Sequence, residues 1–383
     1  MNNAQITAKG DAFVMNTYKR IPVAFVKGEG SWLWDADGNK YLDFLSGLAV
    51  NCLGYNHPVM VKAISEQAAK VMHTSNLYWV GPQVELAEVL VKQSGLGKAF
   101  FCNSGAEANE SAIKLARKYA KAKMGEDKYG IITFTSSFHG RTLATLAATG
   151  QTKYQKGFEP LPEGFGYAKY GDLEDLEGKI TNNTCAVMLE PIQGEGGINV
   201  PTAEFLKGVR DLCDKKGLLL IFDEVQCGIG RTGKFFAHQN FGVKPDILTL
   251  AKSLAGGFPI GAMVASDEVA EGFGPGDHAS TFGGSHLACS TALAVVNHIL
   301  QNNIMEHNAK MGAYLMGKFE ELKEKYSFIK EVRGMGLMIG IQLEADGNWV
   351  LDQCQKEGLI INCVGGNVLR LLPPYIITKE EAN

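Results

Sequence analysis

A lysine and a pair of carboxylates each follow an apolar run, where a solvated charge is not expected. Lys252 follows the apolar residues 247–251, and Asp223 and Glu224 follow the apolar residues 218–222. A lysine at a strand end can form a Schiff base with pyridoxal phosphate (PLP), and a neighbouring acid can keep its pyridine nitrogen protonated. The two positions therefore indicate PLP chemistry, with Lys252 and Asp223 as catalytic residues.

A possible phosphate site follows residues 98–102. Ser104 and Glu107 have the spacing of a capping box at the start of an Ala-, Glu- and Lys-rich helix. At such a helix start, Gly105 and Ala106 would offer free N–H groups and the positive end of the helix dipole to an anion. The alternative is an ordinary capped helix without a ligand.

Two more polar loops follow apolar runs. Phe138, His139 and Arg141 come after residues 131–134, where a ring could stack on a flat cofactor and a guanidinium could grip a carboxylate. Read alone, this segment could equally be a surface loop. The glycine-rich loop 190–197, which contains Glu195, follows residues 185–189 and could likewise be only a turn.

The apolar runs predict an α/β fold. Buried strands are expected at 98–102, 131–134, 185–189, 218–222, 247–251 and 260–265, with helices at 109–124 and 203–216. Strands that alternate with helices predict a mostly parallel sheet covered on both faces. Its ligand site should lie at the carboxyl ends of the strands.

The rest of the chain predicts a smaller α+β domain. Residues 1–55 contain a hairpin pattern near 24–35 and are assigned to it, residues 56–284 to the large domain, and residues 285–383 to the small domain again. That last segment should hold a helical stretch over 286–326 and strands at 337–343 and 367–372. Thr378 and Glu381 form a capping box just before the chain stops, so we expect a missing terminal helix, unless the match is accidental.

Composition excludes several classes of function. The chain has 383 residues, which favours two domains, and a net charge of -4, which gives no basic surface for nucleic acid or an anionic membrane. Its eight cysteines show no CxxC and no clustering, and its histidines show no metal-ligand spacing. Without a signal peptide or a membrane-spanning run, a cytoplasmic protein with small-molecule partners and no metal is expected.

Residues 228–233 match the GxGxxG pattern of dinucleotide-binding proteins. Five residues separate this segment from the preceding apolar run, and Gly242 and Pro245 leave no room for a full crossover helix after it. This context favours a turn.

Together these motifs resemble the class III (omega) PLP-dependent aminotransferases, and most closely their acetylornithine aminotransferases. The resemblance rests on Ser-Gly-Ala-Glu-Ala-Asn (104–109), Phe-His-Gly-Arg (138–141), Glu-Pro-Ile-Gln-Gly-Glu (190–195), Asp-Glu-Val-Gln (223–226) and Thr-Leu-Ala-Lys (249–252). It spans about residues 15–378. It implies fold type I, the aspartate-aminotransferase fold, and a homodimer with shared active sites.

The resemblance also implies roles for individual residues. Lys252 would bind PLP and move the reacting proton, Asp223 would hold the pyridine nitrogen, and Gln226 would reach the phenolic oxygen. Phe138 and His139 would contact the ring, and Ser104, Gly105 and Ala106 would hold the phosphate. Thr281 would reach the phosphate from the neighbouring subunit.

The implied substrates are N-acetylornithine, which gives up its side-chain amine, and 2-oxoglutarate, which carries a carboxylate at each end. Arg141 would bind the donor's α-carboxylate and the acceptor's distal carboxylate, with Tyr18 and Ser280 also at the substrate. Arg370 would be masked by Glu195 for the donor and released for the acceptor; without the resemblance, this pair would be an ordinary ion pair.

Ornithine, succinylornithine and 4-aminobutyrate remain alternative donors, and an aminomutase is an alternative reaction. Leu48 and His139 stand where ornithine aminotransferases carry tyrosine and tryptophan, which favours an acylated donor. Ser285 and His286 replace the Asn-Pro that is common in the family and leave the local turn open.

Overall fold

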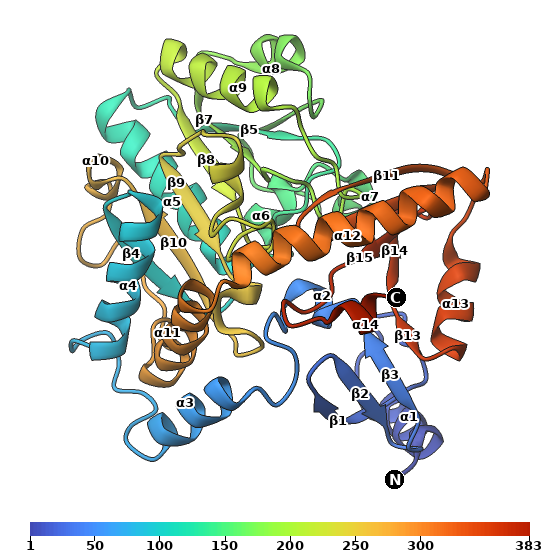
Figure 1. The fold of residues 1–383 in the computed structure, drawn as a ribbon. Coiled ribbons are helices and arrows are strands. Elements are labelled where there is room, and N and C mark those ends of the chain that lie inside the picture. Colours follow the sequence, from blue (N-terminus) through green and yellow to red (C-terminus); the bar gives the residue numbers. More distant parts are fainter.

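A computed structural model describes residues 1–383, and its largest element is a seven-stranded sheet (Figure 1). The strand order is β4-β10-β9-β8-β7-β5-β6. β10 runs antiparallel to both of its neighbours, and the other pairings are parallel, which confirms the predicted mostly parallel sheet. The strands are β4 (Lys98–Cys102), β5 (Gly130–Phe134), β6 (Phe165–Ala168), β7 (Thr184–Leu189), β8 (Leu219–Asp223), β9 (Ile247–Leu250) and β10 (Gly261–Ala265).

Helices cover both faces of this sheet, as alternate strand residues show. Leu219 and Ile221 join the buried cluster under α5 (Gly105–Lys123), whereas Leu220 and Phe222 join the larger cluster with α9 (Ala203–Lys216) and α11 (His286–Gln301). Successive side chains of a strand point to opposite faces, so a strand buried on both sides is apolar throughout. This is why the strands could be recognised as continuous apolar runs.

Two four-stranded sheets lie beside the large one (Figure 1). The predicted N-terminal hairpin is present, and a strand from near the C-terminus pairs in parallel with β3, so segments from both ends of the chain share one sheet. Its strands are β1 (Phe25–Glu29), β2 (Trp32–Asp35), β3 (Lys40–Asp43) and β13 (Leu359–Ile360). The other sheet is antiparallel and consists of β11 (Ile329–Met335), β12 (Met338–Leu343), β15 (Val368–Leu371) and β14 (Asn362–Val364).

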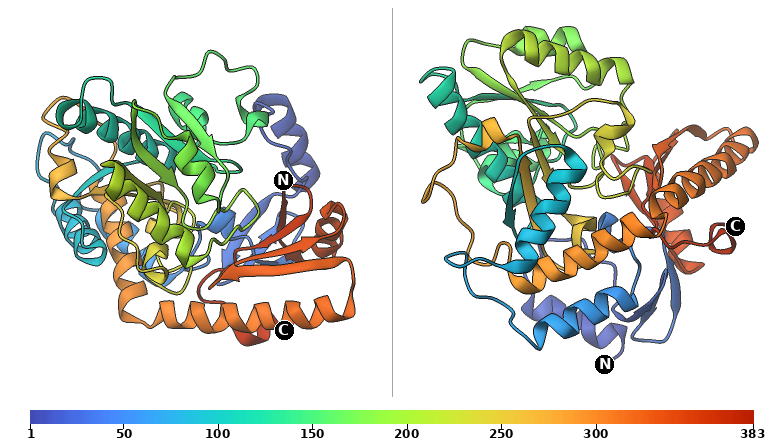
Figure 2. Two further views of the ribbon diagram at one scale, coloured as in Figure 1. Left: turned by 90° about the horizontal axis from the view of Figure 1, so that it is seen from above. Right: turned by 60° about the vertical axis from the view of Figure 1, so that its left-hand side comes forward.

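The helical stretch expected over 286–326 is two helices rather than one. α11 ends at Gln301, and α12 (Ile304–Lys325) begins after Asn303, whose φ of 56° lies in the left-handed region and ends the first helix. Asparagine adopts that conformation more easily than most residues. Both views in Figure 2 show α12 along the β11–β12 sheet, which it contacts.

The remaining helices are shorter connections around these sheets. The predicted capping box forms on the last of them, where Thr378 accepts from the Glu381 N–H, and the Glu381 carboxylate also accepts from the Trp32 indole at 2.7 Å. No helix has both the length and the apolar composition to cross a bilayer. They are α1 (Asn3–Phe13), α2 (Ser46–Ala49), α3 (Pro58–Ala68), α4 (Gly81–Ser94), α6 (Leu143–Ala148), α7 (Thr152–Gln155), α8 (Leu173–Lys179), α10 (Asp267–Ala270), α13 (Asn348–Lys356), α14 (Lys379–Ala382), and the 3-10 turns η1 (Ala237–Asn240) and η2 (Lys252–Ala255).

Candidate active site

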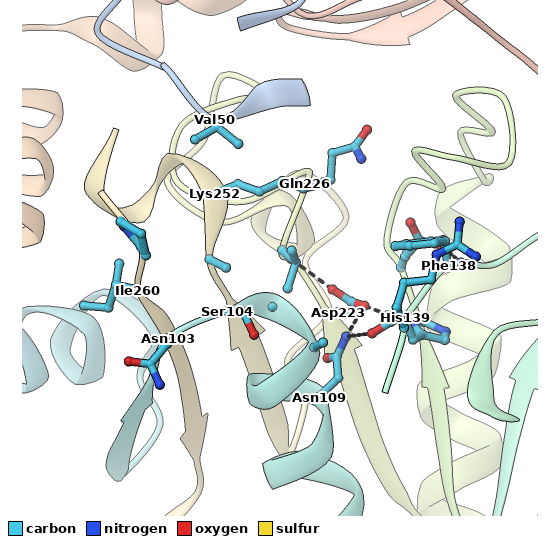
Figure 3. Close-up of a pocket in the computed structure, with 18 of the residues that line it drawn as sticks. Val50, Asn103, Ser104, Asn109, Phe138, His139, Asp223, Gln226, Lys252 and Ile260 are labelled. Carbon is cyan, nitrogen blue, oxygen red and sulfur yellow. Dashed lines mark hydrogen bonds and ion pairs between the residues drawn. The ribbon is translucent and has the colours of Figure 1, made fainter. Parts of the chain in front are cut away.

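The carboxyl ends of β4, β5, β7, β8 and β9 meet at one edge of the large sheet and enclose a cavity of about 420 Å³ (Figure 3). Parallel strands deliver their following loops to the same edge, which is why motifs far apart in sequence come together here. The predicted residues that line the cavity are Ser104, Gly105, Ala106, Phe138, His139, Arg141, Asp223, Gln226 and Lys252.

Lys252 has a strained backbone. Its φ of 45° lies in the left-handed region, which costs a residue other than glycine about 1–3 kcal/mol and persists only where neighbours enforce it. The next residue provides that support: the Ser253 hydroxyl donates to the Ala49 carbonyl at 2.9 Å, and the Tyr375 hydroxyl lies 3.1 Å from it. The lysine is thus held by two segments outside the large sheet.

The Lys252 amine makes no hydrogen bond or ion pair within the protein. Burial lowers its pKa; Glu195 opposes this shift, and the Arg370 guanidinium adds to it. A lysine with a lowered pKa is more readily neutral, the form in which an amine attacks a carbonyl carbon.

Asp223 is held by three groups from different parts of the chain. One carboxylate oxygen lies 2.7 Å from the Asn109 side-chain nitrogen and 2.8 Å from His139 Nδ1, and the other accepts the Val225 N–H at 3.0 Å (Figure 3). Only 3% of the residue is exposed. Sequence reasoning missed Asn109 as a partner, although it closes the quoted 104–109 motif.

His139 is therefore placed by Asp223, and its other ring nitrogen, Nε2, is buried without a partner. The peptide N–H of His139 donates to the Thr149 hydroxyl at 2.9 Å, which fixes the loop. Gly140 follows with a φ of 142°, and a Cβ there would lie 2.4 Å from the Thr145 hydroxyl. Glycine is required for this close approach.

Glu190 joins two loops of the cavity. Its carboxylate accepts the Phe138 N–H and the Gly194 N–H, each at 3.1 Å, and so ties the loop after β5 to the loop after β7. Burial and then the charge of Asp223 raise its pKa to about 7, although His139 acts in the opposite direction. Sequence reasoning gave Glu190 no role, although its position after an apolar run was the same signal that selected Asp223.

The helix start at Ser104 differs from the predicted capping box in one respect. Ser104 does cap the helix, since its hydroxyl accepts the Glu107 N–H, but the Glu107 carboxylate binds the Asn103 N–H at 2.8 Å and not that of Ser104. The Ser104 N–H donates to no protein group. Together with the free N–H groups of the first helical turn, it leaves an anion site facing the cavity.

Glu195 and Arg370 form an ion pair beside this cavity, with 2.6 Å between Oε1 and a guanidinium nitrogen. Gln226 accepts from the same Arg370 nitrogen at 3.1 Å, and Asn362 accepts from Nε, while the other terminal nitrogen of Arg370 is buried without a partner. A Cβ on Gly194 would lie 2.2 Å from Gln226 Oε1, so only glycine permits this packing.

The charge state of Glu195 follows from these neighbours. Burial alone would raise its pKa, but Arg370 and then Lys252 outweigh burial and hold the pKa below its ordinary value. The carboxylate is therefore ionised at neutral pH and neutralises Arg370.

Besides Glu195 and Arg370, which lie beside the cavity, three other predicted substrate or cofactor residues do not line it. Tyr18 is 71% exposed, and the Arg20 guanidinium carbon lies 5.3 Å from the centre of its ring. Ser280 touches the rim, where its hydroxyl accepts from Asn103 at 3.1 Å, and Thr281 is exposed. Ser280 and Thr281 instead line a second, open hollow with Tyr78.

The GxGxxG segment forms a turn, as its context predicts. Arg231 in this segment is fully buried and donates to the carbonyls of Leu337 and Pro373. The turn leads to the short η1 and not to a crossover helix, so it offers no helix start for a pyrophosphate.

Comparison with known families identifies the class of protein to which this chain belongs. Residues 13–383 match the model of the family described as aminotransferase class-III. The chain is a class III aminotransferase. Enzymes of this class use PLP, so PLP is its cofactor.

The side chains of this aminotransferase fit that cofactor. Lys252 offers an amine without a protein partner, and Asp223 offers a buried carboxylate that a protonated ring nitrogen would neutralise. The free N–H groups at Ser104 would receive the phosphate. His139 Nε2 is a buried polar atom that lacks a partner within the chain.

Named relatives of this aminotransferase include acetylornithine and ornithine aminotransferases. The acetylornithine aminotransferase of Methanocaldococcus jannaschii is 54% identical over 367 residues, 96% of this chain and 92% of that protein. The solved acetylornithine aminotransferase of Elizabethkingia anophelis is 36% identical, with a TM-score of 0.88 over 100% of this chain and 96% of the other. An ornithine aminotransferase structure from Toxoplasma gondii, with partial PLP occupancy at its active site, is 34% identical, with a TM-score of 0.96 over 100% and 91%.

Proposed function

We propose that the protein transfers the side-chain amino group of N-acetylornithine to 2-oxoglutarate, giving N-acetylglutamate 5-semialdehyde and glutamate. The observation that carries this proposal is the 2.6 Å pair of Glu195 and Arg370 beside Lys252. In a donor whose reacting amine is remote from its carboxylate, the reacting end of the molecule carries no negative charge toward Arg370. An acceptor with two carboxylates places one of them at this end and needs a cation there. A neutralised arginine that can be uncovered meets both needs.

The residues divide the chemistry among them. When bound, PLP withdraws electrons from the substrate carbon that carries the amine. Asp223 keeps the proton on the pyridine nitrogen, and Lys252 Nζ moves the proton to and from the substrate carbon. Arg141 binds the donor's α-carboxylate at the open side of the cavity, and Arg370 binds the acceptor's carboxylate once Glu195 moves away.

The donor has one serious rival, since the ornithine aminotransferase of Toxoplasma gondii aligns with a TM-score of 0.96. One residue favours the acylated donor, since Leu48 offers no polar group for a free α-amine. The expectation that His139 also favours it is not supported, because its side chain is taken up by Asp223 and does not discriminate between donors. The names of the sequence relatives support the same choice.

A donor panel tests this function. N-acetylornithine, ornithine, succinylornithine and 4-aminobutyrate are each assayed with 2-oxoglutarate, and glutamate is measured against donor consumed. We expect N-acetylornithine to give the highest kcat/KM with one glutamate per donor, and Lys252→Ala to give none. A higher kcat/KM for another donor would replace the proposed substrate. Turnover without consumption of 2-oxoglutarate would instead identify an aminomutase.

We also propose that the protein works as a cytoplasmic homodimer that shares its active sites. Thr281, the predicted phosphate contact, is exposed next to apolar side chains that are large and open to solvent: Leu77 at 87%, Trp79 at 91% and Phe282 at 65%. Exposed apolar patches of this kind mark contact surfaces. Sedimentation should give twice the 41.4 kDa chain mass, and Trp79→Glu should give monomers with weakened PLP binding. A monomeric wild-type protein that retains full activity would refute the dimer.

A further inference from the structure

Arg141 stands at the cavity without any polar partner. Its side chain is exposed and takes part in no hydrogen bond or ion pair within the chain. Its guanidinium carbon instead lies 3.9 Å from the centre of the Tyr154 ring and 5.3 Å from that of Phe138. Contact with ring faces leaves all of the guanidinium's N–H groups free for a ligand.

Tyr154 lies on a short helix that side-chain hydrogen bonds hold in place. It belongs to α7, and the glutamines on either side of it are both anchored. Gln151 donates to the Ser137 carbonyl at 2.9 Å. Gln155 donates to the Thr149 carbonyl and to the Tyr167 hydroxyl, each at 2.9 Å. The Gln151 bond ties α7 to the loop that carries Phe138 and Arg141, and the Gln155 bonds tie it to the end of α6 and to β6.

The Tyr154 ring also contacts Phe138 edge to face, with 6.0 Å between ring centres and an angle of 86°. Its hydroxyl forms no hydrogen bond, so the ring face and not the hydroxyl makes the contacts. The Lys153 ammonium also contacts the Tyr154 ring, with Nζ 4.8 Å from the ring centre, but Lys153 does not line the cavity.

We propose that Tyr154 is a positioning residue that holds Arg141 ready for the substrate carboxylate. An exposed arginine samples many rotamers, and a carboxylate that binds it must restrict them. A ring face that already restricts them removes part of that cost without competing for the N–H groups. This inference rests on the proposed role of Arg141, and it adds a residue that sets affinity for carboxylate-bearing donors.

The test compares Tyr154→Phe, which keeps the ring, with Tyr154→Leu, which keeps an apolar side chain but removes the ring. The holoenzymes are assayed with N-acetylornithine and with N-acetylputrescine, the same molecule without its carboxylate. Tyr154→Leu should raise the KM for N-acetylornithine about 5-fold, the factor that one exposed cation–π contact supplies, with kcat nearly unchanged. Tyr154→Phe should match the wild type, and the N-acetylputrescine KM should be the same in all three proteins.

A binding measurement without turnover accompanies the assay. Calorimetry with glutarate, an unreactive dicarboxylate, should show the same loss of about 5-fold in Kd for Tyr154→Leu. Lys153→Met, which removes the other cation on the ring, is the matched control and should leave Kd unchanged. Equal losses in Tyr154→Phe and Tyr154→Leu, or in Lys153→Met, would overturn the proposal.

Failure of the proposed function would appear differently from failure of this inference. If Arg141 does not bind the donor carboxylate, wild-type protein would show the same KM for both acetylated amines, and Arg141→Met would not change either value. If Arg141 does bind it but Tyr154 does not position it, Arg141→Met would raise the N-acetylornithine KM and Tyr154→Leu would not.

Discussion

Two carboxylates of this site, Asp223 and Glu195, are held in opposite ways. Asp223 ends a central strand, is 3% exposed and accepts from three groups on three separate segments. The Glu195 side chain is 22% exposed, lies in a glycine-rich loop and has one strong partner, Arg370. A carboxylate with several fixed donors cannot leave its position, whereas one held by a single ion pair can.

The difference matches what each carboxylate must do. The pyridine nitrogen needs the same partner in both half-reactions, so its acid can be built rigidly. The substrate end of the cavity must present a neutral surface to one substrate and a cation to the next. The unpartnered terminal nitrogen of Arg370 shows that this guanidinium is not fully satisfied by the closed pair. It can therefore gain contacts when a substrate carboxylate arrives.

The largest effect should come from neutralising the fixed carboxylate. Asp223→Asn keeps the shape of the side chain but cannot hold a proton on the pyridine nitrogen. We expect kcat to fall by about 10²–10⁴-fold, the usual range for losing a positioned acid or base. Steady-state kinetics with saturating PLP measures this loss.

Asp246→Asn is the matched control for Asp223→Asn, because Asp246 lies just before β9, away from the cavity, and pairs with Arg210 at 2.9 Å. It should change stability and leave kcat near the wild-type value. A loss of less than tenfold in Asp223→Asn would mean that the pyridine nitrogen is not protonated by this residue.

A smaller and more selective effect should come from neutralising the movable carboxylate. Glu195→Gln removes the negative charge that neutralises Arg370. The preference for N-acetylornithine over 4-aminobutyrate, expressed as a ratio of kcat/KM values, should then fall about 10-fold, which corresponds to about 1.4 kcal/mol. The maximal rate with 2-oxoglutarate should change little.

Glu331→Gln provides the comparison for Glu195→Gln, since Glu331 forms an ion pair of the same length, 2.6 Å, with Arg333, but is largely exposed and lies outside the cavity. The donor ratio of this control should equal that of the wild type. An unchanged ratio in Glu195→Gln as well would show that the buried pair is only structural.

That Asp223 and Lys252 share one site could be predicted from the sequence, because both residues follow strands of the large sheet. Apolar runs that end in Asp223 and Lys252 predict strands whose ends meet, and the structure brings both residues into one cavity. β6 was missed because its four residues, Phe-Gly-Tyr-Ala, include a glycine and give no continuous apolar run. The single helix expected over 286–326 failed at Asn303, whose left-handed φ carries only a weak sequence signal.

Contacts between side chains that are far apart in the sequence were harder to predict. His139 and Asp223 are 84 positions apart, and their hydrogen bond depends on how the loop after β5 folds back. Glu195 and Arg370 could be paired in advance only through the family resemblance, because no spacing rule links residues 175 positions apart. The ring of Tyr154 under Arg141 had no sequence signal at all, since an aromatic residue on a short polar helix is ordinary.

The smallest expected effect is a change in the stability of the PLP-free protein when Lys252 is replaced. Both carboxylates, Asp223 and Glu195, attract this lysine. In the PLP-free protein, burial lowers the Lys252 pKa below its ordinary 10.5 despite Glu195 and Asp223. Between the lowered pKa and 10.5, the unfolded chain binds more protons than the folded one. Wild-type stability therefore rises with pH across this window and is lost as pH falls through the folded pKa.

Lys252→Met removes this titration, so the PLP-free variant should be more stable than PLP-free wild type at neutral pH, and its advantage should shrink as pH approaches 10.5. Urea unfolding midpoints at several pH values measure the gap. Lys62→Met, on the exposed surface of α3, should show a gap that does not change with pH. A gap that is also constant for Lys252→Met would mean that Glu195 and Asp223 together cancel the cost of burying the amine, so that the movable carboxylate also stabilises the charged lysine.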